Sequence, residues 1–203
     1  MKKRKEDRRI KRSRQLLKDS FITLLEERNF TDITITNIVH RSDLNRSTFY
    51  AHFRDKEELL ACIIDELLDG MISSMDQRPL HEQSTLEKYG LAQHSIFQLF
   101  VYVSDYASYF KAMLRDQRLP QFTFRLSESL YLFYFKKIKQ DKDAPEHLHI
   151  NHGFFANYIA SVIVGFIYHW LIHTDMKYNP EYIAKEFNKI FTLNTDFSYL
   201  HTN

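Results

Sequence analysis

The sequence predicts an all-α protein. Only four Gly and four Pro occur among its 203 residues, and no run alternates apolar and polar residues between turn residues as a half-exposed strand would. Apolar residues instead recur at three- and four-residue spacing over most of the chain, which is typical of amphipathic helices. An apolar share of 44%, with 15% aromatic residues, is enough for a hydrophobic core and excludes a disordered chain.

Charge is distributed unevenly along the chain. Residues 1–56 hold 15 Lys and Arg against 8 Asp and Glu, a net charge of +7, whereas residues 57–203 carry a net −5. A basic end joined to an acidic body predicts that the first part binds a polyanion such as nucleic acid. The alternative is a basic face that is simply well solvated. We therefore predict two domains, 1–56 and 57–203.

The N-terminal part fits a helix-turn-helix domain of three helices. A basic arm at 2–14 runs into an amphipathic helix that is expected to end near Arg28. Thr34 is a suitable N-terminal cap for a short helix at 35–41, and Asn45 for a second short helix. Two short helices joined by a few residues and supported by a longer one form this motif.

The rest of the chain is expected to be a helical domain. A fourth helix should run from about residue 56 to residue 75 and break at 77–79. The further helices are expected at 84–103, 106–115, 119–140, 154–173 and 180–193, with a polar loop at 141–152.

The stretch NRSTFYAHF, which starts at Asn45, carries the side chains that indicate function. In a helix-turn-helix protein, the first turn of the second helix enters the major groove and meets base edges. Here that turn holds Arg46, Ser47 and Thr48. An arginine can pair with guanine through two hydrogen bonds, and a threonine can contact thymine or adenine. The stretch therefore predicts a DNA-reading surface.

Phosphate contacts are expected on both sides of this turn. Tyr50, His52 and Lys56 can donate hydrogen bonds to phosphate oxygens, and such contacts fix the register of a protein on DNA without reading its sequence. Thr34 and Thr36 open the preceding helix, where free backbone N–H groups also favour a phosphate.

Purely structural roles are the alternatives at several of these positions. Phe49 and Phe53 are four residues apart and are expected in the core of the small domain. Thr34 and Thr36 can serve as capping residues alone, with Thr34 the better candidate for both roles. His52 can be an ordinary surface histidine.

The run FTDITITNIVHRSDLNRSTFYAHFRDKEELL, residues 30–60, resembles the DNA-binding domain of the tetracycline-repressor (TetR) family of bacterial transcription regulators. That family has a Thr at the start of the second helix, an Ile-Ala pair, a loop close to Ala-Gly-Val-Ser, a Thr-hydrophobic-Tyr run, a His-Phe pair and a Lys. The corresponding residues here are Thr34, Ile38-Val39, Ser42-Asp43-Leu44-Asn45, Thr48-Phe49-Tyr50, His52-Phe53 and Lys56.

Two residues of the turn depart from the family pattern. Asp43 stands where the family usually has Gly, so the turn is expected to hold Asp43 in a left-handed conformation, which Asp tolerates better than most residues. Asn45 replaces the usual Ser, and both residues are good helix caps.

The resemblance implies roles for these residues and for the whole chain. It places Arg46, Ser47 and Thr48 against bases, and Thr34, Tyr50, His52 and Lys56 against phosphates. It implies a homodimeric cytoplasmic regulator, at the bacterial nucleoid when bound, that binds a palindromic operator in double-stranded DNA. A repressor released by an effector is the expected form. The alternatives are a coactivator or partner-controlled regulator without an inducer, and a nonspecific basic binding module.

The segment 154–172 has no charged residue. A transmembrane span needs about 20 apolar residues, but a helix buried on all sides has the same composition. The polar side chains in this segment favour the buried helix. Because such a helix needs cover on two sides, we expect the helices near 154–173 and 180–193 to pair with a second copy of the chain, as the resemblance also implies.

A small apolar or aromatic effector is implied by the resemblance. An aromatic pocket with a few hydroxyls would suit such a ligand, while plain core is the structural alternative for the same rings. The candidate lining residues are Phe100, Tyr106, Tyr109, Phe110, Phe122, Tyr131 and Tyr134.

Other functional classes are not expected. Four glycines cannot assemble a phosphate-cradling loop, a dinucleotide fingerprint or a nucleophile elbow, so neither catalysis nor a cofactor is predicted. The single cysteine, Cys62, fits a reducing cytoplasm and inert packing. No apolar stretch follows the basic N-terminus, so no secretory signal is expected. No metal site is predicted, because the candidate histidines are not accompanied by a Cys pair. These histidines are His147, His149, His152, His169 and His173.

Overall fold

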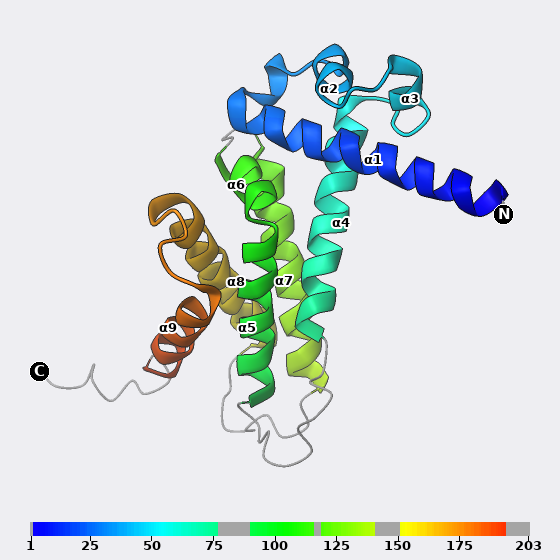
Figure 1. The fold of residues 1–203 in the computed structure, drawn as a ribbon. Helices are drawn as coiled ribbons and strands as arrows, with labels where there is room; N and C mark the ends of the chain where they lie inside the picture. Colours follow the sequence, from blue (N-terminus) through cyan, green and yellow to red (C-terminus); the bar gives the residue numbers. More distant parts are fainter. Residues whose placement is uncertain (1, 77–89, 116–118, 141–150, 194–203) are drawn as a thin grey trace, which may run out of the picture. The chain divides into compact units, whose positions relative to one another are not determined.

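The computed structural model describes residues 2–76, 90–115, 119–140 and 151–193, and over these residues the protein is helical without a strand (Figure 1). The predicted all-α fold is confirmed. The elements are α1 (Lys2–Glu27), η1 (Phe30–Asp32), α2 (Ile35–Arg41), α3 (Arg46–Tyr50), α4 (Lys56–Asp76), α5 (Gly90–Asp105), α6 (Ala107–Arg115), α7 (Pro120–Gln140), α8 (His152–Tyr168), η2 (His169–His173) and α9 (Pro180–Leu193).

The chain divides into two compact units. Unit 1 consists of Met1–Leu67 with Ser108–Phe122, and unit 2 consists of Leu68–Ala107 with Thr123–Asn203. The divisions fall inside α4, after the first residue of α6, and inside α7. By its contacts, α6 therefore groups with the N-terminal helices, which the contiguous predicted domain 1–56 does not include.

Unit 1 is built around large apolar side chains from each of its N-terminal helices. Leu17 and Phe21 of α1, Ile38 of α2, Phe49 of α3 and Leu59 of α4 are all completely buried. Burying one such side chain contributes about 1.5–3 kcal/mol relative to leaving it exposed. This shared core fixes α2 and α3, which are too short to be stable alone.

Unit 2 has its core at the contact of α5, α8 and α9. The buried Trp170 ring lies edge-to-face on Phe100 with centroids 5.7 Å apart, and Phe187 of α9 lies 6.3 Å from Phe100. Trp170 sits in η2, a single π-helical turn that continues α8. Its Nε1 donates to the Tyr178 carbonyl at 2.9 Å, so the ring is both packed and hydrogen-bonded.

Most predicted helices are present, with shifted ends. α8 begins at His152 because the side chain of Asn151 caps it, accepting hydrogen bonds from the amides of Gly153 and Phe154. The prediction of a polar loop at 141–152 is therefore wrong at His152, which belongs to α8. Residues 141–150 of that predicted loop lie outside the described residues. The helix predicted at 84–103 corresponds to α5. Its predicted first residues, 84–89, also lie outside the described residues.

The apolar helix over His152–His173 is covered on one face only. Its buried side carries Ala156, Ile159, Ala160 and Ile163. By length and composition alone, this is the one described helix that would be able to cross a membrane. A core helix of a soluble protein passes the same test, so one such helix is weak evidence for a span.

Among the described residues of unit 2, one buried side-chain polar atom lacks a hydrogen-bond partner. The hydroxyl of Tyr134 on α7 is buried and finds no hydrogen bond among the described residues, and burial raises the pKa of Tyr134 above the ordinary tyrosine range. A buried polar group without a partner costs about 1–3 kcal/mol.

We therefore expect Tyr134→Phe to raise the free energy of unfolding by about 1 kcal/mol, because it removes the unpaired hydroxyl and keeps the ring. Urea unfolding measures the change. Tyr182→Phe is the matched control, since the Tyr182 ring is exposed and its change should have little effect. A clear loss of stability in Tyr134→Phe would mean that the hydroxyl has a partner in solution.

Candidate DNA-binding site

The first helix of the motif starts at a complete capping box. The Thr34 hydroxyl accepts from the Asn37 amide at 3.2 Å, and the Asn37 side chain accepts from the Thr34 amide at 2.9 Å. The predicted capping role of Thr34 is confirmed. Thr34 and Thr36 both remain exposed, so a phosphate can reach this helix end.

The turn between α2 and α3 depends on Asp43. Its φ is 53°, the left-handed conformation that the sequence predicts for an Asp in place of Gly. The Leu44 amide then reaches back to the Val39 carbonyl at 3.0 Å. The turn therefore closes tightly and delivers Asn45 in an extended conformation at the start of α3.

Asn45 is the cap of α3, as predicted. Its Oδ1 accepts from the Thr48 amide at 2.8 Å, from the Ser47 hydroxyl at 2.7 Å and from the Thr48 hydroxyl at 2.9 Å. A single side-chain oxygen thus orders the first turn and both hydroxyls on it.

Arg46 differs from its two neighbours in having nothing to hold its side chain. It is exposed at the first position of α3, and within the described part of the chain it makes no ion pair. Ser47 is also exposed, Thr48 is half-buried, and the Tyr50 ring is more than half exposed at the helix end. The guanidinium is therefore the group on α3 with most freedom to reach a base edge.

Below this surface, the two predicted core phenylalanines anchor the helix. Phe49 and Phe53 are both buried, with ring centroids 5.9 Å apart, which confirms their structural role. α3 ends at Tyr50, so His52 and Phe53 lie in the turn that follows rather than in the helix.

His52 is held by α1. Its Nε2 lies 2.7 Å from the Ser13 hydroxyl. Burial lowers the pKa of His52, and the nearby positive charge of Arg14 lowers it further, so the ring is neutral at pH 7. As a phosphate ligand it would donate through a neutral N–H.

Lys56 has a structural role that the sequence did not reveal. Its Nζ donates to the Phe30 and Ile33 carbonyls, both at 2.8 Å, and lies 4.4 Å from the centroid of the Phe30 ring. These carbonyls belong to η1 and its C-terminal cap. The ammonium therefore secures the chain that leads into α2, and its predicted phosphate contact would have to compete with these bonds.

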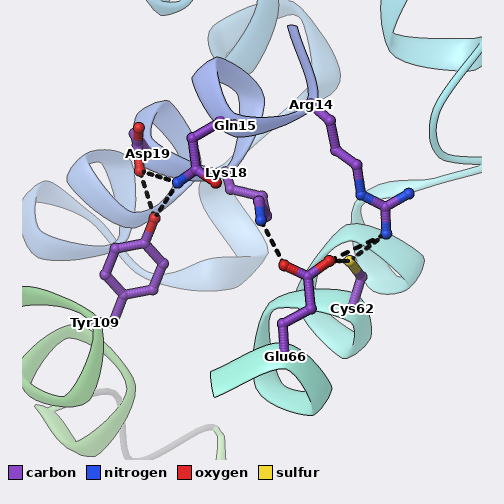
Figure 2. Close-up of polar contacts among 7 residues, drawn as sticks. All are labelled: Arg14, Gln15, Lys18, Asp19, Cys62, Glu66 and Tyr109. Carbon is purple, nitrogen blue, oxygen red and sulfur yellow. Dashed lines mark hydrogen bonds and ion pairs between the residues drawn. The ribbon is translucent and has the colours of Figure 1, made fainter. Parts of the chain in front are cut away.

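Further polar contacts join α1 to α4 and α6 (Figure 2). Arg14 donates to the Cys62 sulfur at 2.8 Å and pairs with Glu66, which also pairs with Lys18. Burial raises the pKa of the Cys62 thiol, and the Glu66 carboxylate raises it further. The thiol is therefore protonated at neutral pH, which fits the predicted inert packing.

Tyr109 of α6, which is predicted as an effector contact, makes polar contacts with α1. Its hydroxyl donates to Asp19 and accepts from Gln15 at 3.1 Å (Figure 2). No short-range pattern reveals this contact, because the partners are about 90 residues apart in sequence.

The other predicted effector residues are divided between the two units. Phe110 and Phe122 are buried core rings of unit 1, with centroids 5.9 Å apart. Phe100 fills the core of unit 2, and Tyr106 is exposed and stacked on Tyr102. The last two predicted residues lie on α7. Tyr131 is half-buried and stacked on Phe135, and Tyr134 carries the buried hydroxyl without a hydrogen bond in the described structure.

Metal ligands do not gather in the part of the chain that the structure describes: no three His, Cys, Asp or Glu side chains come together there. The His169 and His173 rings are neighbours, with centroids 5.5 Å apart. His147 and His149 lie outside the described residues.

Comparison with known proteins agrees with this geometry. Residues 22–63 match the model for "Bacterial regulatory proteins, tetR family", and residues 92–193, just over half of the chain, match a "Transcriptional regulator C-terminal region" of the same family. The chain belongs to the TetR family. The resemblance seen in residues 30–60 is thereby confirmed, and the TetR fold indicates a transcription factor rather than an enzyme.

Relatives of this TetR-family protein share its fold. A TetR-family regulator from Syntrophomonas wolfei superposes with a TM-score of 0.74 at 18% identity, covering 90% of this chain and 96% of the other. A TetR regulator from Streptococcus agalactiae 2603V gives 0.61 at 20% identity, covering 91% and 96%. An uncharacterized HTH-type transcriptional regulator, YxbF of Bacillus subtilis (strain 168), is 27% identical over 188 residues. That match covers 89% of this chain but 45% of the relative, so the chain spans about half its length.

We expect Lys56→Gln to lower the free energy of unfolding by about 1–3 kcal/mol, because the Phe30 and Ile33 carbonyls lose a charged donor. Thermal unfolding measures it. Arg54→Gln, an exposed neighbour with the same loss of charge, should change stability little. If Lys56→Gln keeps full stability but its DNA affinity falls, the ammonium acts on phosphates and its bonds to η1 are dispensable.

Proposed function

We propose that this chain is a homodimeric TetR-family regulator that binds a palindromic operator in double-stranded DNA and represses transcription until an effector releases it. The observation that carries the proposal is the first turn of α3. A cap orders the backbone of this turn, and the Arg46 guanidinium stands exposed on it without an ion pair in the described structure. An exposed arginine at this position of a helix-turn-helix suits a guanine in the major groove.

The surrounding side chains support a division of roles. Ser47 and Thr48 are ordered by Asn45, so they present fixed hydroxyl and methyl groups to a neighbouring base pair. Tyr50 is exposed at the far end of α3 and Thr36 at the start of α2, where they suit phosphates. His52 would add to the same backbone contacts through the ring nitrogen that its contact with Ser13 leaves available. The amide and the hydroxyl of Thr34 both donate to the Asn37 side-chain oxygen, so a phosphate bound by Thr34 would have to replace one of these bonds.

The uncovered face of α8 supports the homodimer. Five exposed positions, defined here as the α8 stripe, follow one another at alternating four- and three-residue spacing: Phe154, Tyr158, Ser161, Gly165 and Tyr168. This spacing is that of a helix seam that packs against another helix. A side chain added at Gly165 would meet nothing within 4 Å, which leaves room for close approach of a second helix. We propose that this stripe and α9 pair with a second copy.

Release by a small molecule rests on Tyr134. Its buried hydroxyl lacks a hydrogen bond within the described structure, and a polar atom on an apolar or aromatic ligand would satisfy it. A ligand that bound one arrangement of the dimer better than another would shift the population of DNA-binding dimers. Such a regulator acts in the cytoplasm, at the nucleoid when bound.

Selection from a random duplex pool tests the base-reading role. The wild type should enrich a palindrome, and Arg46→Ala should lose preference at one position of each half-site, worth about 1–3 kcal/mol of discrimination. Arg54→Ala removes the same charge from an exposed site and should leave the motif unchanged. An Arg46→Ala motif identical to that of the wild type would refute the assignment. A wild type that enriches no motif would refute the operator itself.

Sedimentation of Gly165→Arg tests the α8 stripe. Because the position faces open space, the protomer should fold normally, while a second helix can no longer approach closely. We expect the wild type to be a dimer and the variant a monomer, with the same helical content by circular dichroism. Gln121→Arg, an exposed position on α7, should remain dimeric. A dimeric Gly165→Arg protein would place the interface elsewhere.

A further inference from the structure

We propose that the N-terminal part of α1 is a rigid helical arm whose arginines bind the DNA backbone beside the bases that α3 reads. This inference rests on the proposed DNA binding and adds a second contact surface to it. The arm is defined as residues 2–12 of α1, and Arg8, Arg9 and Arg12 are the described arginines on it.

The arm lies beyond the core of unit 1. Core packing along α1 starts at Leu17, which is completely buried, whereas residues 8–12 are all exposed. In Figure 1 the N-terminal end of α1, in dark blue, runs on past α3 and past the start of α4 without another helix drawn beside it. Helical rise of about 1.5 Å per residue carries its first residues roughly 17 Å beyond Ser13. A helical segment whose described side chains, at residues 8–12, are all exposed needs a role other than core packing.

The three arginines share one side of the arm. At about 100° per residue, Arg8, Arg12 and Arg9 fall within roughly 100° of the helix circumference, and Ser13 follows next to Arg9. None of the three guanidinium groups has an ion pair or hydrogen bond among the described side chains; the Ser13 hydroxyl donates to the backbone carbonyl of Arg9. Like charges at positions i and i+4, as in Arg8 and Arg12, destabilise a helix by about 0.2–0.5 kcal/mol. An anion along this side would remove that repulsion.

Two contacts fix this side of the arm relative to the recognition helix. The Ser13 hydroxyl lies 2.7 Å from Nε2 of His52, and the Arg14 guanidinium lies 5.1 Å from the centroid of the Phe53 ring. Both partners come directly after α3, whose last residue is Tyr50. The arm therefore leaves the core of unit 1 at the end of the recognition helix, on a rigid connection rather than as a free tail.

These contacts decide in favour of DNA as the partner. When the base-reading turn of α3 is in the major groove, the rigid connection holds the arm beside the same duplex. Guanidinium groups bind phosphates tightly and in two-pronged geometry. Their contribution is independent of base sequence, and each neutralised phosphate adds about 0.9 to the slope of log affinity against log salt concentration.

The experiment compares full-length wild type with the triple variant Arg8→Gln, Arg9→Gln and Arg12→Gln. Glutamine keeps the helix propensity of the arm, and circular dichroism checks the fold. The matched control is Lys136→Gln, Lys139→Gln and Lys177→Gln, three exposed cations of unit 2 that lie outside α8 and α9. Affinity is measured on a random-sequence duplex from 50 to 300 mM salt, and the DNA motif of each protein is obtained by selection.

We expect the arm variant to lose about 2 to 3 from the salt slope for each protomer, or about 5 for a dimer bound through both arms, and to keep the wild-type motif, while the control keeps both. On the selected operator, hydroxyl-radical footprinting should show that the arm variant loses protection at backbone next to the conserved bases. An arm variant with the same salt slope as the wild type, or a control variant that loses as much slope as the arm variant, would refute the arm as a DNA contact. So would preserved DNA binding with lost affinity for phosphatidylserine vesicles, which would assign the arm to a membrane surface.

The test separates the arm from the proposed function. If the wild type enriches no motif, the operator reading by α3 fails, yet the salt slopes on random duplex still decide whether the arm binds phosphates. If the motif appears and the slopes are equal, the operator stands and the arm inference falls.

Discussion

The side-chain oxygen of Asn45 is the contact on which the DNA-reading surface depends. α3 has five residues, a single turn, and a helix so short is not stable alone in water. It persists because Asn45 holds its first turn through the Thr48 amide and both neighbouring hydroxyls, while buried Phe49 holds its last. The left-handed Asp43 is what brings Asn45 to that position. The Asn45 cap, the Asp43 turn and the buried Phe49 ring together position Arg46 at the exposed start of α3.

α1 is the element that carries this small surface. Its apolar side supplies Leu17 and Phe21 to the core of unit 1, and its polar side makes contacts with three separate segments. Ser13 meets the turn after α3, Arg14 and Lys18 meet Glu66 on α4, and Asp19 meets Tyr109 on α6 (Figure 2). The same helix thus orients the recognition helix and extends as the basic arm, which explains why one long helix serves a domain with two very short ones.

Local chemistry made the helix-turn-helix predictable from sequence. Capping depends on a residue and the three that follow it, so Thr34 and Asn45 were identifiable, and the strained turn followed from an Asp in place of Gly. Long-range contacts were not predictable in this way. The Lys56 ammonium binds carbonyls more than 20 residues away, and Tyr109 binds a helix about 90 residues away. The predicted effector residues are divided between two units for the same reason: aromatic periodicity marks burial but not which core a ring enters.

Amide hydrogen exchange at Thr48, combined with duplex selection, tests the central claim that the Asn45 cap creates the reading surface. Asn45→Ala should expose the Thr48 amide, speed its exchange at least about fivefold for a cap worth about 1 kcal/mol, and weaken the selected motif. Asn45→Ser restores a capping oxygen and should preserve both protection and motif. If Asn45→Ala keeps the Thr48 amide protected and selects the same motif as the wild type, the surface does not depend on this cap and the account is contradicted.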